Sequence, residues 1–267
     1  MLNEHPSAGD LLRDWRQRRR LSQLALAVDA EISQRHQSFL ESGRSQPSRE
    51  MVLRLTERLS VPLRERNMIL TAAGFAPIYQ ERPLDAPELG AARAAIDQIL
   101  QGHEPHPALA VDRNWTLLSA NKAVGVLMTG IADHLVGGEI NVLRLSLHPE
   151  GLASRIVNFQ EWRAHILTRL VHEIDVSAAP RLAALLEELK SYPTPPHAMS
   201  KRAGPVVEGG IVVPLMLSSD EGPLSFISTT TVFGTAIDVT LSEMTIETFF
   251  PANPETASSM AKLLARS

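Results

Sequence analysis

Cysteine is absent from this sequence of 267 residues. Disulfide bonds, thiolate metal sites and cysteine nucleophiles are therefore excluded together. The sequence also lacks any run of about 18 uncharged apolar residues, so we expect no transmembrane helix. Its opening residues, MLNEHPSAGD, contain neither the basic segment nor the apolar stretch of a secretory signal. We therefore expect no membrane partner and a cytoplasmic location.

Common enzyme signatures are absent as well. No G-x-S-x-G, G-x-G-x-x-G or Walker A pattern occurs, and the carboxylates are scattered singly. The letters S-x-x-K occur at Ser119 and Lys122 without the partner motifs of a serine acylase. His103 and His106 lie in a proline-interrupted segment with no third ligand nearby in the sequence. We predict that the protein is not an enzyme, with no catalytic residue, no metal site and no required cofactor.

The composition that is present indicates a folded chain with an uneven charge. Apolar residues make up 44% of the sequence, which is enough for one large or two ordinary domains. Residues 1–80 contain 12 Arg, no Lys and 9 acidic residues, a net charge of +3, while the remainder contains 14 basic and 21 acidic residues, a net charge of −7. Arginine suits phosphate and guanine recognition because its guanidinium donates two parallel hydrogen bonds.

The segment from Ser22 to Pro47, SQLALAVDAEISQRHQSFLESGRSQP, predicts two short helices joined by a tight turn. Ser22 and Ser33 are good N-caps for these helices, and Gly43 suits the left-handed backbone at the end of the second. Flanking helices bring the expected number to five within the first 80 residues. This is the layout of a DNA-reading helix-turn-helix, whose second helix enters the major groove by its N-terminal turn. Duplex DNA is the predicted partner.

From residue 107 the apolar pattern changes to one of strands and longer helices. A long helix is expected within Leu152–Ile174 and another over Pro180–Tyr192. The expected strands are Ala108–Val111, Thr116–Ser119, Ile211–Leu217, Leu224–Val232 and Glu243–Phe250. Two strands, a block of helices and three strands form the chain order of a PAS-like fold, which has a cavity between its sheet and its helices. The predicted fold class is therefore α+β, with an all-α five-helix N-terminal domain and a PAS-like domain containing an antiparallel sheet of about five strands.

Several stretches resemble a known family. SQLALA…ISQRHQSFLESGRSQPS is similar to the Xre-type helix-turn-helix, and VLRLTERLSVPLRERNMILTAAGFAPIY, HPALAVDRNWTLLSAN and NFQEWRAHILTRL resemble the MmyB-like transcriptional regulators. The resemblance spans residues 8–255. We expect a DNA-binding domain at 8–80, a linker with an amphipathic helix at 81–106, and a PAS-like ligand-binding domain at 107–255. The linker helix is compatible with transmitting motion, with a dimer seam, or with packing on the second domain.

The DNA-binding candidates come from the helix-turn-helix motif. Gln34 can pair with adenine and Arg35 with guanine, each through two hydrogen bonds, while Gln23 is placed to bond a phosphate. The resemblance adds Ser38 as a base-reading position and Phe39 as an exposed one whose ring could touch a thymine methyl group. The full set of candidates is Gln23, Ser33, Gln34, Arg35, Ser38, Phe39 and Arg44. Gln37 departs from the motif because this position normally holds an apolar residue that packs the recognition helix.

The second domain is expected to hold a mostly apolar pocket with a few polar groups. The resemblance implies an apolar, fatty-acid-like ligand, whose carboxylate would require an arginine or amide donor. The apolar candidates are Phe159, Trp162, Ile166 and Phe226, and the polar candidates are Asn121, Arg144, Asn158 and Arg169. Each of these residues also has an ordinary role open to it, as a core side chain, a cap or a surface ion pair.

The predicted function is that of a sequence-specific transcriptional regulator whose second domain senses a small apolar ligand, with a bound fatty acid as the first candidate. Ligand would shift a conformational population and so change the spacing of two DNA-reading heads. A homodimer is expected because recognition helices that read two half-sites must lie roughly 34 Å apart. The alternative is a DNA-binding regulator whose second domain is a dimerisation or protein-interaction module without a small ligand.

Overall fold

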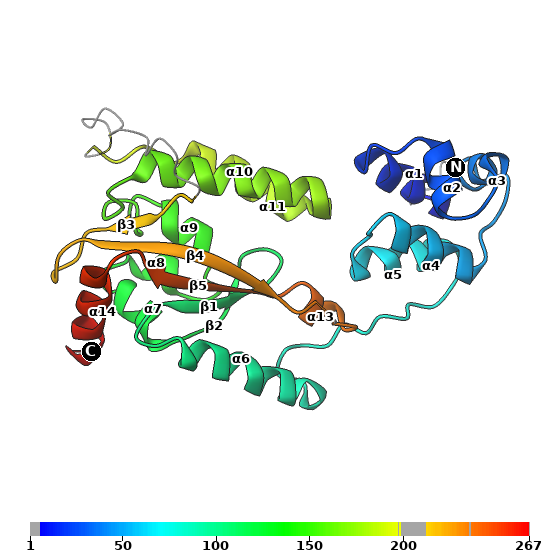
Figure 1. Cartoon of the computed structure of the whole chain (residues 1–267). Coiled ribbons are helices and arrows are strands. Elements are labelled where there is room, and N and C mark those ends of the chain that lie inside the picture. The colour runs from blue at the N-terminus through cyan, green and yellow to red at the C-terminus, as the bar shows by residue number, and fades with distance from the viewer. Residues whose placement is uncertain (1–5, 197, 199–211, 235, 267) are drawn as a thin grey trace. The chain divides into compact units, whose positions relative to one another are not determined.

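The computed structural model describes residues 6–196, 198, 212–234 and 236–266 (Figure 1). The chain divides into two compact units. The first contains Met1–Arg82, Asp175–Ser177 and Thr235–Ser242, and the second contains Pro83–Ile174, Ala178–Gly234 and Glu243–Ser267. Within the described part of the chain, no helix combines the length and the apolarity that crossing a membrane requires.

The N-terminal part of the first unit consists of five helices, as predicted. They are α1 (Ala8–Arg18), α2 (Gln23–Asp29), α3 (Gln34–Glu41), α4 (Arg49–Arg58) and α5 (Leu63–Ala72). The first four each begin after a serine whose side chain accepts a hydrogen bond from the backbone N–H three residues on. Such caps satisfy amide groups that the helix itself leaves unpaired, so they fix where each helix begins.

The second unit is built on a five-stranded sheet in which every pairing is antiparallel. Its strands, in the spatial order β2-β1-β5-β4-β3, are β1 (Ala108–Val111), β2 (Leu117–Ala120), β3 (Leu215–Leu217), β4 (Leu224–Val232) and β5 (Thr245–Pro251). The predicted α+β class and the chain order of two strands, helices and three strands are confirmed.

Three of the predicted strands begin later than expected. β2 begins at Leu117, next to a register shift in its pairing with β1, and β5 begins at Thr245. The strand expected at Ile211–Leu217 is formed only by Leu215–Leu217, and residue 211 lies outside the described residues. Pro214 precedes β3 directly, and proline cannot donate a ladder hydrogen bond.

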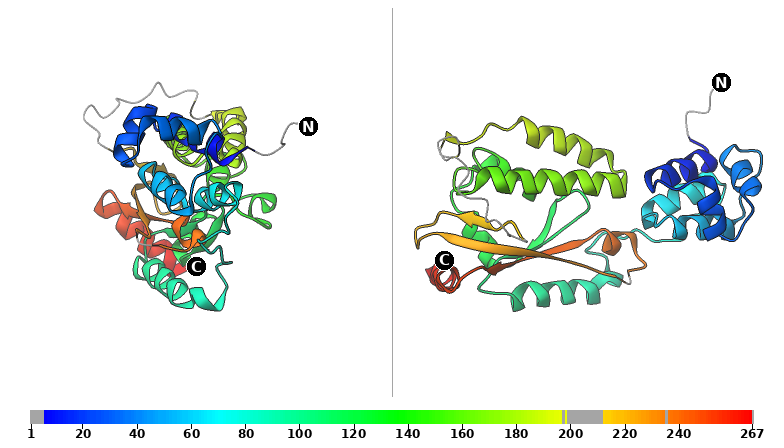
Figure 2. Two further views of the ribbon diagram at one scale, coloured as in Figure 1. Left: turned by 90° about the vertical axis from the view of Figure 1, so that its right-hand side faces the viewer. Right: turned by 45° about the horizontal axis from the view of Figure 1, so that its top comes forward.

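Helices cover both faces of this sheet. In Figures 1 and 2, α10 (Phe159–Ser177) and α11 (Pro180–Ser191) lie over one face and α6 (Gly90–Gly102) lies over the other. The helix expected in the linker is therefore packed on the second unit, with Ile96 and Leu100 buried and with contacts to β1. The remaining helices within the described residues are η1 (Pro87–Leu89), α7 (Lys122–Leu127), α8 (Asp133–Val136), α9 (Val142–Leu147), α13 (Val239–Ser242) and α14 (Pro254–Arg266).

Some helices differ from the sequence prediction. The long helix expected within Leu152–Ile174 begins only at Phe159, because the residues before it form turns and an isolated bridge from Ile156 to Leu217. The sequence pattern also gave no indication of α8, α9 or α14. The core lies between the sheet and α10 and α11, and it contains the fully buried Phe159 and Phe226.

Candidate functional site

The start of α3 presents most of the predicted base-reading side chains to solvent. Gln34 and Arg35 are exposed, while Ser38 and Phe39 are partly exposed one turn further on. The guanidinium carbons of Arg35 and Arg44 lie 5.3 and 5.9 Å from the centre of the Phe39 ring. Two cations therefore lie close to one aromatic ring.

Ser33 has a structural role at the same helix end. Its hydroxyl accepts the backbone N–H of His36 at 3.1 Å, which caps α3. The cap fixes the direction in which α3 begins, and so it orients the side chains of Gln34 and Arg35.

A buried polar cluster holds α3 against α1 and α2. Glu41 at the end of α3 receives two hydrogen bonds from Arg16, at 2.6 and 2.7 Å. The amide nitrogens of Gln37 and Gln23 each donate to the same carboxylate at 2.8 Å. Burial would raise the pKa of Glu41, but the hydrogen bonds from Arg16, Gln23 and Gln37 outweigh it and hold that pKa below its ordinary value.

This cluster explains the departure at Gln37. The side chain turns inward and is fully buried, where its amide bonds Glu41 in place of the usual apolar contact. Gln23 belongs to the same cluster. Its amide, which is predicted to contact a phosphate, donates a hydrogen bond to the buried carboxylate of Glu41. The position of α3 therefore depends on a charge pair that joins residues 25 positions apart in the chain.

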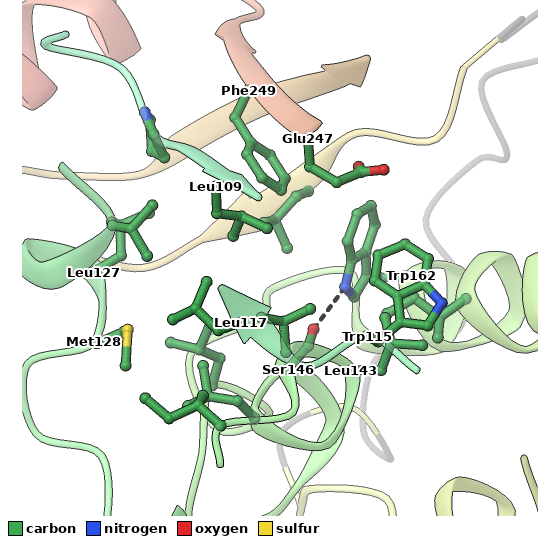
Figure 3. A pocket seen from close by; sticks show the side chains of 18 of the residues that line it. Leu109, Trp115, Leu117, Leu127, Met128, Leu143, Ser146, Trp162, Glu247 and Phe249 are labelled. Atoms are coloured by element: carbon green, nitrogen blue, oxygen red, sulfur yellow. Dashed lines mark hydrogen bonds between the residues drawn. The ribbon is translucent and has the colours of Figure 1, made fainter. Parts of the chain in front are cut away.

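The second unit contains a cavity of about 110 Å³ between the sheet and the helices (Figure 3). Most of its lining side chains are apolar, and they come from β1, β2, β3, β5 and from α7, α9 and α10. The apolar residues are Pro107, Leu109, Trp115, Leu117, Val124, Leu127, Met128, Ile140, Val142, Leu143, Leu145, Leu152, Trp162, Ile166, Leu170, Leu215, Leu217 and Phe249. The polar lining residues are Ser146, His165, Arg169 and Glu247.

Three of the four polar lining residues are hydrogen-bonded to other lining side chains. The indole N–H of Trp162 donates to the hydroxyl of Ser146 at 3.0 Å, which joins α10 to α9 (dashed line in Figure 3). Arg169 donates to the carboxylate of Glu247 at 2.6 Å, which joins α10 to β5. Burial, together with the nearby charge of Arg169, lowers the pKa of His165, so its imidazole is neutral at neutral pH.

Arg169 is the one cationic side chain among the lining residues of the cavity. Besides Glu247, it bonds Glu173 at 3.1 Å and the hydroxyl of Thr230 at 3.2 Å, and its guanidinium lies 4.5 Å from the centre of the Trp115 ring. Glu173 in turn accepts the indole N–H of Trp115 at 2.7 Å. Burial would lower the pKa of Arg169, but the two carboxylates raise it, so the guanidinium is always charged.

Three of the predicted ligand-binding residues meet at this cavity. Trp162, Ile166 and Arg169 all line it from successive turns of α10. They lie three or four positions apart on one helix, and this spacing is the sequence signal that predicts a shared face.

The other five predicted ligand-binding residues do not line the cavity. Phe159 and Phe226 are core side chains, each less than 2% exposed. The amide of Asn121 donates to the carbonyls of Leu100 and His106, and its oxygen accepts the backbone N–H groups of Ala108 and Val124, so this side chain is fully used in capping.

Arg144 and Asn158 are likewise occupied elsewhere. Arg144 makes two hydrogen bonds to Glu188, at 2.6 and 2.8 Å, and so links α9 to α11. The hydrogen bond from Arg144 lowers the pKa of Glu188 to about 2. Asn158 donates to the carbonyl of Pro214 and accepts the backbone N–H of Met216, which attaches the start of α10 to β3.

Sequence reasoning missed Glu247, Ser146 and Trp115 among the lining residues. Glu247 had a usable signal, because an acidic residue inside an apolar strand sequence such as TIETFF needs a partner when it is buried. Ser146 had none, since α9 is a short helix of six residues with no apolar periodicity long enough to predict it.

One group of side chains in the described part of the chain has a composition suited to a metal ion. His134, His148 and Glu150 have ligand atoms within 4.8 Å of one another. The group lies outside the cavity lining, and the Nδ1 atom of His148 already accepts the backbone N–H of Glu150 at 3.1 Å. His103 and His106 do not converge on a shared ligand, and the ring of His103 bonds the carbonyl of Phe249.

Comparisons with known proteins agree with this division of roles. Residues 92–263 match a family model described as the MmyB-like transcription regulator ligand binding domain, and residues 7–68 match one described as a helix-turn-helix domain. No curated protein matches the chain. Among solved structures, an RNA-binding light-oxygen-voltage receptor aligns with 98% of this chain and 64% of its own length, at 13% identity and a TM-score of 0.29. That score is too low to support a structural argument.

Proposed function

This chain belongs to the MmyB-like transcription regulators, and we propose that its cavity senses a small apolar ligand with an acyl chain. In the chain, a helix-turn-helix domain is followed by the ligand-binding domain. A fatty acid is the first candidate. Binding of this ligand shifts the population of conformations that present α3 to operator DNA.

The observation that supports this proposal is the cavity itself. Its lining is mostly apolar, and Arg169 is the one cationic side chain among its lining residues. A cavity must offer about 10–15 Å³ to hold one water molecule, so a cavity of about 110 Å³ has room for several. A methylene group is about as large as a water molecule, so a chain of several carbons is a suitable probe, and we choose one of eight.

DNA recognition is proposed to use the candidate residues on α2 and α3. Arg35 and Gln34 would read bases, and Gln23 would bond a phosphate while also holding Glu41. We propose a homodimer on the operator, since paired half-sites one helical turn apart require two recognition helices.

Adjacent residues on β2 allow a matched test of the ligand proposal. Leu117 lines the cavity, whereas its neighbour Leu118 is outside the lining and 36% exposed. Successive side chains of a strand point to opposite faces, so Leu117→Trp fills the cavity and Leu118→Trp does not. Calorimetry with octanoic acid and 1-octanol should show binding to the wild type and to Leu118→Trp, and a loss of about tenfold or more in Leu117→Trp.

The effect on DNA follows from the same variants. An operator selected from random duplexes should bind all three proteins when ligand is absent. Octanoic acid should then change operator affinity in the wild type and in Leu118→Trp, and leave Leu117→Trp unchanged. If neither probe binds the wild type, the second domain is better described as a protein-interaction module.

A further inference from the structure

Arg169 and the two carboxylates paired with it sum to a net negative charge before any ligand enters. Arg169 provides one positive charge, and Glu247 and Glu173 provide two negative ones. The two carboxylates differ in their surroundings, since the side chain of Glu247 is 5% exposed and that of Glu173 is 29% exposed. Solvent can stabilise an ionised Glu173, whereas Glu247 depends on Arg169 for its charge.

The other groups that face Glu247 are not cations. From α10, His165 is neutral at neutral pH because burial and Arg169 lower its pKa. From β4, the hydroxyl of Thr230 donates to Glu247 at 2.9 Å. From β1, the strand partner of Glu247 is the apolar Leu109. Arg169 is therefore the one cation that compensates Glu247 among the described residues.

A carboxylate ligand creates a conflict at this point. Its head group would compete with Glu247 for the guanidinium of Arg169, which also donates a hydrogen bond to Glu173. One guanidinium cannot compensate the charges of both the ligand carboxylate and Glu247 while it is shared with Glu173. A carboxylate that is buried without a partner takes up a proton in preference to remaining charged.

We propose that Glu247 is the proton-accepting group of the ligand site, so that a carboxylic acid ligand binds Arg169 together with the uptake of one proton by Glu247. This inference rests on the proposed function. The net charge of the site is unchanged by binding. The ligand anion adds one negative charge, and one proton from solvent converts Glu247 from a carboxylate to a carboxylic acid. Its new O–H group can donate to the ligand carboxylate or to the hydroxyl of Thr230. An alcohol with the same chain brings no charge and needs no proton.

The test is calorimetry with octanoic acid and 1-octanol on the full chain between about pH 6 and pH 8.5, where the free acid is ionised in solution. In the wild type, the dissociation constant of octanoic acid should rise by about tenfold per pH unit, and that of 1-octanol should stay constant. Measurements in two buffers of different ionisation enthalpy should give one proton taken up per acid bound.

Glu247→Gln removes the proton acceptor and keeps the shape of the side chain. This variant should bind octanoic acid with an affinity that no longer depends on pH, and 1-octanol binding serves as its check of folding. Glu187→Gln makes the same change of charge at a residue outside the cavity lining whose side chain is 72% exposed, and it should retain the wild-type slope.

Two outcomes would overturn the inference alone: octanoic acid that binds the wild type with a flat pH profile, or a slope that persists in Glu247→Gln. Failure of both probes to bind at every pH would overturn the proposed function, and this inference with it. Binding of 1-octanol together with a pH-independent affinity for octanoic acid therefore separates the two failures.

Discussion

Replacement of Arg169 by methionine is the most direct test of how the cavity is held together. The variant keeps the length of the side chain but removes the partner of Glu247, whose side chain is 5% exposed and lies 2.6 Å from the guanidinium. Loss of one partner from a buried pair costs about 3–5 kcal/mol, because the other charge is left uncompensated. The lost contact with the Trp115 ring adds about 0.5–1 kcal/mol. We expect a loss of about 3.5–6 kcal/mol in the free energy of unfolding at about pH 8.

The double variant Arg169→Met with Glu247→Gln identifies the cause. It leaves no buried charge behind, so it should be destabilised by only about 1–2 kcal/mol, and more than half of the loss should be recovered. The single variant should also be less destabilised at about pH 6 than at about pH 8. A proton bound to Glu247 in the folded state and absent in the unfolded state makes stability fall as pH rises.

The assay is urea unfolding followed by circular dichroism at both pH values, with the wild type, both single variants and the double variant forming a cycle. A loss below about 1 kcal/mol for Arg169→Met would mean that solvent already compensates Glu247. Failure of Glu247→Gln to restore stability would show that the packing of Arg169, and not its charge, matters. Either result would refute the charge argument.

Three further predictions concern other parts of the molecule. Arg35→Ala should weaken operator binding by about 1–3 kcal/mol and relax the preference at one base pair. Binding to a set of single-base operator variants measures this preference, and an unchanged preference would contradict the placement of α3. Ser146→Ala leaves the buried indole N–H of Trp162 without its acceptor, so it should cost about 1–3 kcal/mol in urea unfolding, and Trp162→Phe should make the same change nearly neutral. Arg144 lowers the pKa of Glu188 to about 2 from 4.5, so their pair stabilises the protein above about pH 4.5 and is lost as pH falls toward 2. Because both side chains are more than a third exposed, the effect should be about 1 kcal/mol, seen as a flatter acid-unfolding curve in Glu188→Gln.

The helices of the N-terminal domain were predictable because their signals are local. Ser22 and Ser33 cap α2 and α3 through backbone amides three residues away, and Gly43 has the positive φ expected at the end of α3. These contacts form within a single turn, so their residues identify them without knowledge of the fold.

The contacts that position α3 could not be predicted in this way. Gln37 departs from the motif in the sequence, and only the structure shows that its buried amide donates to Glu41, which Arg16 also binds. The candidates for the ligand site show the same limit. Asn121 and Arg144 have the right chemistry for a head group, but backbone carbonyls and Glu188 occupy them.

The sequence by itself determined the helix-turn-helix, the α+β order of the second domain, and the stripe on α10 that places Trp162, Ile166 and Arg169 on one cavity wall. Each depends on caps or on periodic apolar residues, whose spacing is set by the geometry of a helix or a strand. Only the tertiary structure decided that Glu247 pairs with Arg169 across 78 positions and that an acidic side chain already lines the cavity. Such partners are selected by burial, which makes an uncompensated charge costly, and burial exists only once the chain has folded.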